Sequence, residues 1–206
     1  MQHPTIVPLL DNDFLGQYRV SMLTGTMGAG LAAASSICHL RNATAGRLLL
    51  FHEIGIAYAS LGTGFTQGTA IFGLIMGRGV TAASASGAAV DLSPDNALDA
   101  TFPTSLSDGL FRIATTAAMT AGAGETLDNN ALVRKFVNTT TAVDTVMTGH
   151  TALLEAQVDR DYPIVVRNGE VLHVNATVPA TGTWQAVISV RWSEVTMVGR
   201  TGAAGV

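Results

Sequence analysis

The sequence predicts an all-β protein whose strands form an antiparallel β-sandwich or a jelly roll. Apolar residues alternate with polar ones along residues 184–192, as expected of a strand with one face on a core. Apolar runs also flank Asn168-Gly169, and Asn-Gly is the strongest short signal for a two-residue turn between strands. No window of twelve or more residues has helical spacing. About ten short strands in some 180 residues therefore imply a sandwich.

The C-terminal strands are the most clearly marked. We expect strands at 164–167, 171–178 and 184–192, joined into a three-stranded antiparallel meander over residues 162–195. In the last strand one face carries the predicted core residues Trp184, Ala186, Ile188, Val190 and Trp192. His173 alternates to the outward face of its strand.

Further strands are expected upstream, separated by clusters of Gly, Asn, Asp, Thr and Pro. Their predicted ranges are 17–24, 31–40, 47–60, 70–77, 109–116, 132–137 and 151–159. The runs 48–51 and 70–76 are apolar on both faces, which predicts strands between two layers or in a subunit contact. A short turn of helix fits residues 94–100, with Ser93 as its N-cap.

The strand pattern predicts one domain with three additional segments. Residues 17–198 form the β-sandwich domain, residues 1–16 an extended N-terminal arm, and residues 199–206 a flexible tail. Within the domain, residues 81–108 form a long irregular loop rich in Ala, Ser, Asp and Pro. Such a long connection is unusual unless it binds something.

The composition favours an assembly protein. The 206 residues include 11 Lys and Arg against 15 Asp and Glu, a net charge of −4. Only 13% of residues are charged, against about 25% in typical proteins, which suits a surface covered by neighbouring subunits. The acidic balance excludes nucleic-acid binding as the main task. We also expect no membrane segment and no signal peptide, and hence a soluble chain made in a reducing cytoplasm.

No motif predicts a nucleotide, metal or other cofactor site. The glycine pairs Gly62/Gly64 and Gly77/Gly79 lack the third glycine of a dinucleotide loop. The single cysteine excludes an intrachain disulfide and a Cys-based zinc site. A calcium loop that could start at Asp11 fails at its fifth and twelfth positions. The five histidines have no metal-binding spacing; they are His3, His39, His52, His150 and His173.

No motif predicts catalysis either, so we expect a protein that is not an enzyme. Cys38 and His39 are adjacent, and on a strand their side chains point to opposite faces. His52 and Glu53 fit a hydrogen-bonded pair near a strand edge. Nothing distinguishes an acid from a base among the remaining carboxylates near one turn, which are Glu155, Asp159, Asp161 and Glu170. The Asn-x-Thr triplets at Asn42, Asn138 and Asn175 carry no meaning without a signal peptide. Trp184 and Trp192 fit a core better than a sugar platform.

The C-terminal half resembles small β-sandwich structural proteins encoded among the head and tail genes of tailed bacteriophages. The resemblance lies in Asp159-Arg-Asp-Tyr-Pro163, then Ile-Val-Val-Arg-Asn-Gly-Glu-Val-Leu-His-Val, then Thr-Gly-Thr-Trp184 and a last strand ending at Glu194. Upstream segments around residues 47–56 and 111–118 extend it over roughly residues 45–195. It is a likeness of strand order and turn placement.

The resemblance implies a virion protein, made in the host cytoplasm, that decorates and stabilises a capsid shell. Its implied partners are the major capsid protein and copies of itself, as a homo-oligomer that is often a trimer in similar proteins. The alternatives are a tail, fibre-adaptor or head-tail connector component, or a carbohydrate-binding β-sandwich module. The sequence gives no catalytic, cofactor or metal residue to any of these readings.

Overall fold

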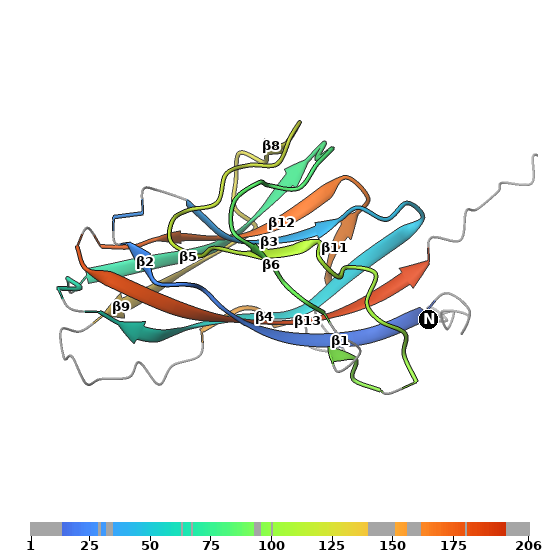
Figure 1. Ribbon diagram of the computed structural model, residues 1–206, viewed down its shortest axis with the longest axis horizontal. Helices are drawn as coiled ribbons and strands as arrows, with labels where there is room; N and C mark the ends of the chain where they lie inside the picture. The colour runs from blue at the N-terminus through green and yellow to red at the C-terminus, as the bar shows by residue number, and fades with distance from the viewer. Residues whose placement is uncertain are drawn as a thin grey trace, which may run out of the picture.

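Two antiparallel β-sheets pack face to face, which confirms the predicted all-β sandwich (Figure 1). The computed structural model describes residues 14–28, 30–31, 35–62, 64–66, 68–92, 96–99, 101–139, 151–155, 162–179 and 181–196. In Figure 1 the strands β12, β3 and β5 form the upper layer, and β4, β13 and β1 form the lower one. Between residues 14 and 196, no described helix is long and apolar enough to cross a membrane.

Sheet A has the order β1-β13-β4-β10. These strands are β1 (Phe14–Leu23), β13 (Thr183–Thr196), β4 (Arg47–Leu61) and β10 (Thr151–Glu155). Two shorter strands join it: β11 (Ile164–Arg167) pairs with β4, and β2 (Met27–Gly28) pairs with β13. The long strands β4 and β13 pair along nearly their whole length.

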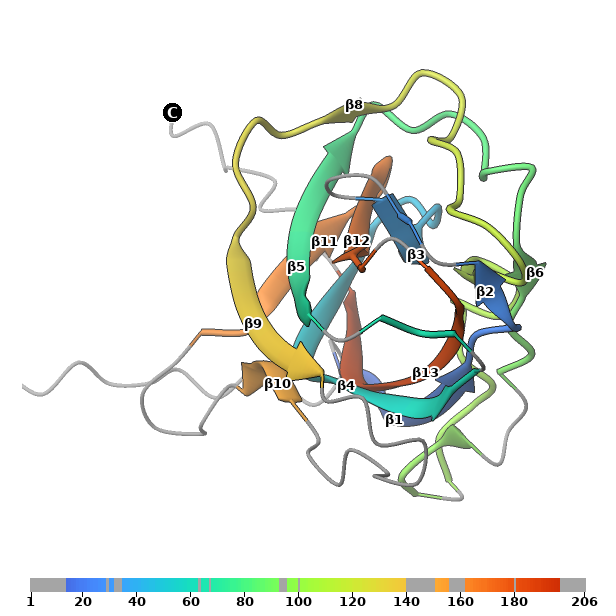
Figure 2. The ribbon, with the colours of Figure 1, turned by 90° about the vertical axis from the view of Figure 1, so that its left-hand side faces the viewer.

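Sheet B has the order β6-β7-β3-β12-β5-β8. Its strands are β6 (Ala88–Ala89), β7 (Phe111–Ile113), β3 (Ser35–Asn42), β12 (Glu170–Thr177), β5 (Gly68–Arg78) and β8 (Thr126–Leu127). Strand β9 (Val133–Thr139) also pairs with β5 and forms an edge of this sheet. Figure 2 shows β9 running down the left side of the sandwich towards β10 of sheet A, which it contacts.

The core lies between the sheets and is built on the predicted alternation. Trp184, Ala186, Ile188, Val190 and Trp192 are all buried, as predicted. The two tryptophans sit in aromatic groups: Tyr58 with Phe72 and Trp184, and Tyr18 and Phe111 with Trp192. These rings are the core of the sandwich and do not form a surface platform for sugars.

The predicted meander is wrong. The strands β11 and β12 flank Asn168-Gly169, but β11 pairs with β4 in sheet A and β12 pairs with β3 and β5 in sheet B. The turn therefore carries the chain from one sheet to the other. Asn42 holds this corner, because its side-chain amide donates to the carbonyl of Val166 and its own carbonyl accepts from the Gly169 N–H.

Most predicted strands exist with shifted ends. The strand predicted at 17–24 begins at Phe14, so the last three residues of the predicted arm belong to β1. The strand predicted at 109–116 is only the three residues of β7, and the one predicted at 151–159 is described as far as Glu155. Residues 1–13, 156–161 and 197–206, and part of the possible helical turn at 94–100, lie outside the described residues.

The long irregular segment is part of a larger connection between β5 and β9, which we call the long connection (residues 79–132). One part lies along the edge of sheet A, where Leu98 N–H donates to the Gln17 carbonyl and Asn96 donates to the Arg19 carbonyl. Another part covers sheet B, as the loops above the upper layer in Figure 1 show. In the described residues, this segment therefore contacts the two sheets of its own chain.

Candidate functional site

A buried polar cluster lies on the outer face of sheet B, the face turned away from the core. Ser36 and His39 come from β3, His173 from β12, and Glu125 from the long connection. His173 uses both ring nitrogens: Nδ1 lies 2.9 Å from Ser36 Oγ, and Nε2 bonds to the Glu125 carboxylate. The His39 ring packs edge-on against the His173 ring at 4.2 Å between centroids. His173 lies on the outward face of its strand, as the alternation predicted, since Leu172 and Val174 face the core; the long connection covers it there, so its side chain is only 1% exposed.

Two glycines explain how Glu125 reaches its partner. A Cβ at Gly77 of β5 would lie 2.0 Å from Glu125 Oε1, so the carboxylate occupies the space that a side chain would fill. The N–H of Gly122 donates to the other carboxylate oxygen at 2.5 Å. Gly77 therefore makes room for this contact, and Gly79 takes a left-handed conformation, with φ of 73°, at the start of the long connection.

Burial and charge fix the protonation states in this cluster. Burial, with the neighbouring His173, lowers the pKa of His39 to about 3, so this ring is neutral at physiological pH. Burial alone would raise the pKa of Glu125, but the hydrogen bonds from His173 and Gly122 outweigh it and lower that pKa. Glu125 is therefore an anion held by two donors.

Ser36, His173 and Glu125 form a hydrogen-bonded chain in the order of a catalytic triad, but these side chains are packed between sheet B and the long connection. Val80, Gly122 and Val171 enclose it together with His39 and Glu125, and the space left among them is about 10 Å³. His173 and Glu125 are each 1% exposed, so a substrate has no access to them. The cluster fastens the long connection to sheet B.

A second buried carboxylate fastens the same connection to sheet A. Glu194, at the end of β13, accepts hydrogen bonds from Ser105 Oγ at 2.5 Å, Leu106 N at 3.1 Å and Ser107 Oγ at 3.2 Å. The indole N–H of Trp192 donates to it at 3.3 Å. Beside it, the Tyr18 hydroxyl donates to the carbonyl of Pro103, and burial raises the pKa of Tyr18 to about 12. Residues 103–107 therefore close one end of the core.

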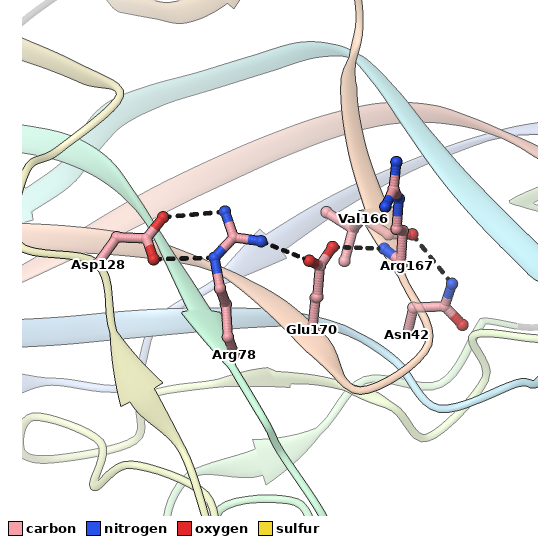
Figure 3. Close-up of polar contacts among 6 residues, drawn as sticks. All are labelled: Asn42, Arg78, Asp128, Val166, Arg167 and Glu170. Atoms are coloured by element: carbon pink, nitrogen blue, oxygen red, sulfur yellow. Dashed lines mark hydrogen bonds and ion pairs between the residues drawn. The ribbon is translucent and has the colours of Figure 1, made fainter.

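A network of charged side chains lies where β5, β8 and the β11–β12 corner meet (Figure 3). Arg78 forms a two-point ion pair with Asp128 at 2.9 and 3.1 Å and contacts Glu170 at 2.6 Å. Glu170 also accepts from the Arg167 N–H at 2.8 Å. The hydrogen bonds from Arg78 lower the pKa of Asp128. The Arg78 side chain is more than half exposed, so its ion pairs add little to the stability of the fold.

An open groove of about 420 Å³ adjoins this network. Its lining combines apolar and charged side chains: Met76, Arg78, Leu132, Ile164, Val165, Arg167 and Glu170. It runs between β11 of sheet A and β5 of sheet B, where the two sheets face each other. No described strand pairs with the free side of β11.

Exposed large apolar side chains line the groove or belong to segments next to its strands. Leu132 and Val165 line it, at 50% and 40% exposure. Leu127 pairs with β5 beside Arg78, and Tyr162 lies two residues before β11. We call Leu127, Leu132, Tyr162, Val165 and the groove the open-edge surface. Apolar side chains with arginines at the rim are typical of protein–protein interfaces.

Other candidate residues from the sequence, among them Cys38, His52 and Glu53, make contacts within the fold. Cys38 is buried in the core and His39 lies on the other face, as expected. His52 does not pair with Glu53: its Nε2 lies 2.8 Å from Ser193 Oγ, while Glu53 lies 3.6 Å from Arg191. Both sit on the central strand β4, and not at an edge. Asn42 and Asn175 are buried. His3, Asp11, His150, Asp159 and Asp161 lie outside the described residues.

Sequence reasoning missed Glu125, Glu194 and the open-edge surface. No local pattern marks the two carboxylates, because His173 lies 48 residues from Glu125 and Ser105 lies 89 residues from Glu194 along the chain. In the described part of the chain, no group of three or more His, Cys, Asp or Glu side chains is placed to hold a metal ion. No protein-family model and no curated protein matches the sequence.

Proposed function

We propose that this chain is a structural protein of a tailed-bacteriophage virion, and specifically a capsid decoration protein that binds and stabilises the shell. The open-edge surface is the observation that carries the proposal. It offers exposed leucine, valine and tyrosine side chains beside a network of arginines and carboxylates, which suits a broad contact with another protein.

The construction of the fold supports the same reading. The buried carboxylates Glu125 and Glu194 fasten the long connection to both sheets, so the surface is held on a stiff body. A stiff surface loses little conformational freedom on binding. The sparse charge of the chain and its resemblance to virion β-sandwich proteins agree with this. The proposed partners are the major capsid protein and further copies of this chain.

Many weak contacts, repeated over a shell, would supply the stabilisation. A protein that binds the assembled shell but not its free subunits stabilises the shell by mass action. When several copies act together, avidity multiplies modest single affinities. The proposal involves no catalysis, no cofactor and no nucleic acid.

The test is co-sedimentation of the purified chain with shells that lack it. We expect the wild type to bind, and Leu132→Asp and Val165→Asp each to weaken binding at least ten-fold. Leu23→Asp is the matched control, because Leu23 is equally exposed but lies at the end of β1, away from the groove. Binding that is unchanged in both groove variants contradicts the assignment of this surface.

A further inference from the structure

A second hollow lies on the outer face of sheet B and has no role in the proposal above. It has a volume of about 180 Å³. Ile71, Gly73 and Ile75 of β5 line it on one side and Asn175 of β12 on the other, with Ala131 and Arg134 also in its wall. At Gly73 the strand β9 packs close, because a Cβ there would lie 2.9 Å from the Val133 carbonyl oxygen and 3.5 Å from Arg134 Cγ.

An exposed aromatic ring stands beside this hollow. Phe136 of β9 lies directly opposite Ile71 in the β5–β9 register, and Arg134 lies opposite Gly73. Residues opposite each other in an antiparallel pair project to the same face. Phe136 is 68% exposed, so its ring projects from the face that also carries the hollow.

We propose that two copies of this chain associate through this face, with Phe136 of each copy inserted into the hollow of the other. A projection and a matching hollow that lie side by side on one surface fit a two-fold contact, in which the same patch serves both copies. An apolar hollow of about 180 Å³ can accept a phenyl ring.

Polar groups at the hollow fit this occupant. Asn175 is 6% exposed, and its Oδ1 is buried with no hydrogen-bond partner among the described residues. Arg134 lies in the wall of the same hollow, so its guanidinium would sit beside the ring that enters from the partner copy. That group carries five N–H donors and can supply the one that Asn175 lacks. Arginine beside an aromatic ring adds a cation–π contact.

The expected dimer is weak. Stable interfaces bury about 800 Å² on each partner, and a contact limited to two rings in two hollows covers less than that. We therefore expect a dissociation constant on the order of micromolar for the isolated protein.

The test is sedimentation velocity over a range of protein concentrations. The wild type is expected to shift from monomer to dimer, while Phe136→Asp and Ala131→Phe raise the dissociation constant at least ten-fold. The first variant removes the ring and the second fills the hollow from its rim. Leu98→Asp is the control, since Leu98 is half exposed on the long connection, and it is expected to dimerise like the wild type.

A second measurement needs no variant. Hydrogen exchange of the wild type should slow at residues 71–75 as the protein concentration rises. A wild type that stays monomeric at every concentration, or a dimer that persists in both variants, overturns the proposal. So does protection at residues 71–75 that appears only with a different protein bound.

This inference does not depend on a role in the virion. If the chain is present in virus particles but monomeric in solution, the two-fold contact is refuted and the virion role stands. If the chain dimerises in solution but is absent from virus particles, the virion role is refuted and the two-fold contact stands.

Discussion

The carboxylate of Glu125 bonds to His173 by passing through the space that a side chain on Gly77 would occupy. The three residues come from the long connection, β12 and β5, so one contact ties together segments that are far apart in the sequence. It also encloses two imidazoles in the protein interior. The first two predictions concern this contact.

Gly77→Ala should lower the free energy of unfolding by about 1–3 kcal/mol, because displacing Glu125 leaves His173 buried without its partner. Glycine to alanine in a strand is otherwise neutral or mildly stabilising, so the sign is diagnostic. Urea denaturation measures the change. Gly28→Ala is the control, because no atom lies within 4 Å of its Cβ position. Equal effects of the two variants would refute the packing role of Gly77.

The protein should lose stability as the pH falls below about 6.5. The folded-state pKa of His39 is lowered to about 3, so between pH 6.5 and 3 the unfolded chain binds a proton at this site that the folded chain does not. The lowered pKa values of Glu125 and His52 act in the same direction. We expect His39 alone to cost about 1 kcal/mol for each pH unit in this range. Denaturation midpoints from pH 7 to 4.5 measure the slope, and His39→Gln should reduce it. A slope that His39→Gln leaves unchanged contradicts this account.

Much of the sandwich could be predicted, because the alternation at residues 184–192 is a direct record of which side chains face the core. The pairing around Asn168-Gly169 could not. The local signal marks the turn but not the partners of the strands beside it, and the corner is held by Asn42, more than 120 residues upstream of Val166. The outward position of His173 was predicted correctly but its burial was not, because alternation identifies the outer face of a strand and not what covers it.

Glu194→Gln should destabilise the fold by about 2–3 kcal/mol and loosen residues 103–107. An amide cannot replace both oxygens that accept from Ser105, Leu106 and Ser107. Urea denaturation and limited proteolysis within this segment measure the two effects. Glu53→Gln is the matched control on the neighbouring strand, where its half-exposed contact with Arg191 contributes about 0–1 kcal/mol. Unchanged proteolysis in Glu194→Gln would show that the carboxylate does not hold the segment.

Asn42→Ala should cost about 2–3 kcal/mol, because this side chain donates to the carbonyls of Arg47 and Val166 and accepts from the Thr44 N–H. These bonds hold the corner where the chain passes between the sheets. The control is Asn138→Ala, since Asn138 is exposed and accepts one hydrogen bond, from Thr69. Thermal unfolding compares the two variants, and a loss of equal size in both would contradict the proposed role of the corner.

The measurement that tests the virion role most directly is the copy number of this chain in gradient-purified virus particles. Quantitative mass spectrometry gives it as a ratio to the major capsid protein. A decoration protein predicts a ratio near one, or a sizeable fraction of one. A handful or a few dozen copies would assign the chain to the tail or the portal instead. Absence from purified particles would contradict the virion role altogether.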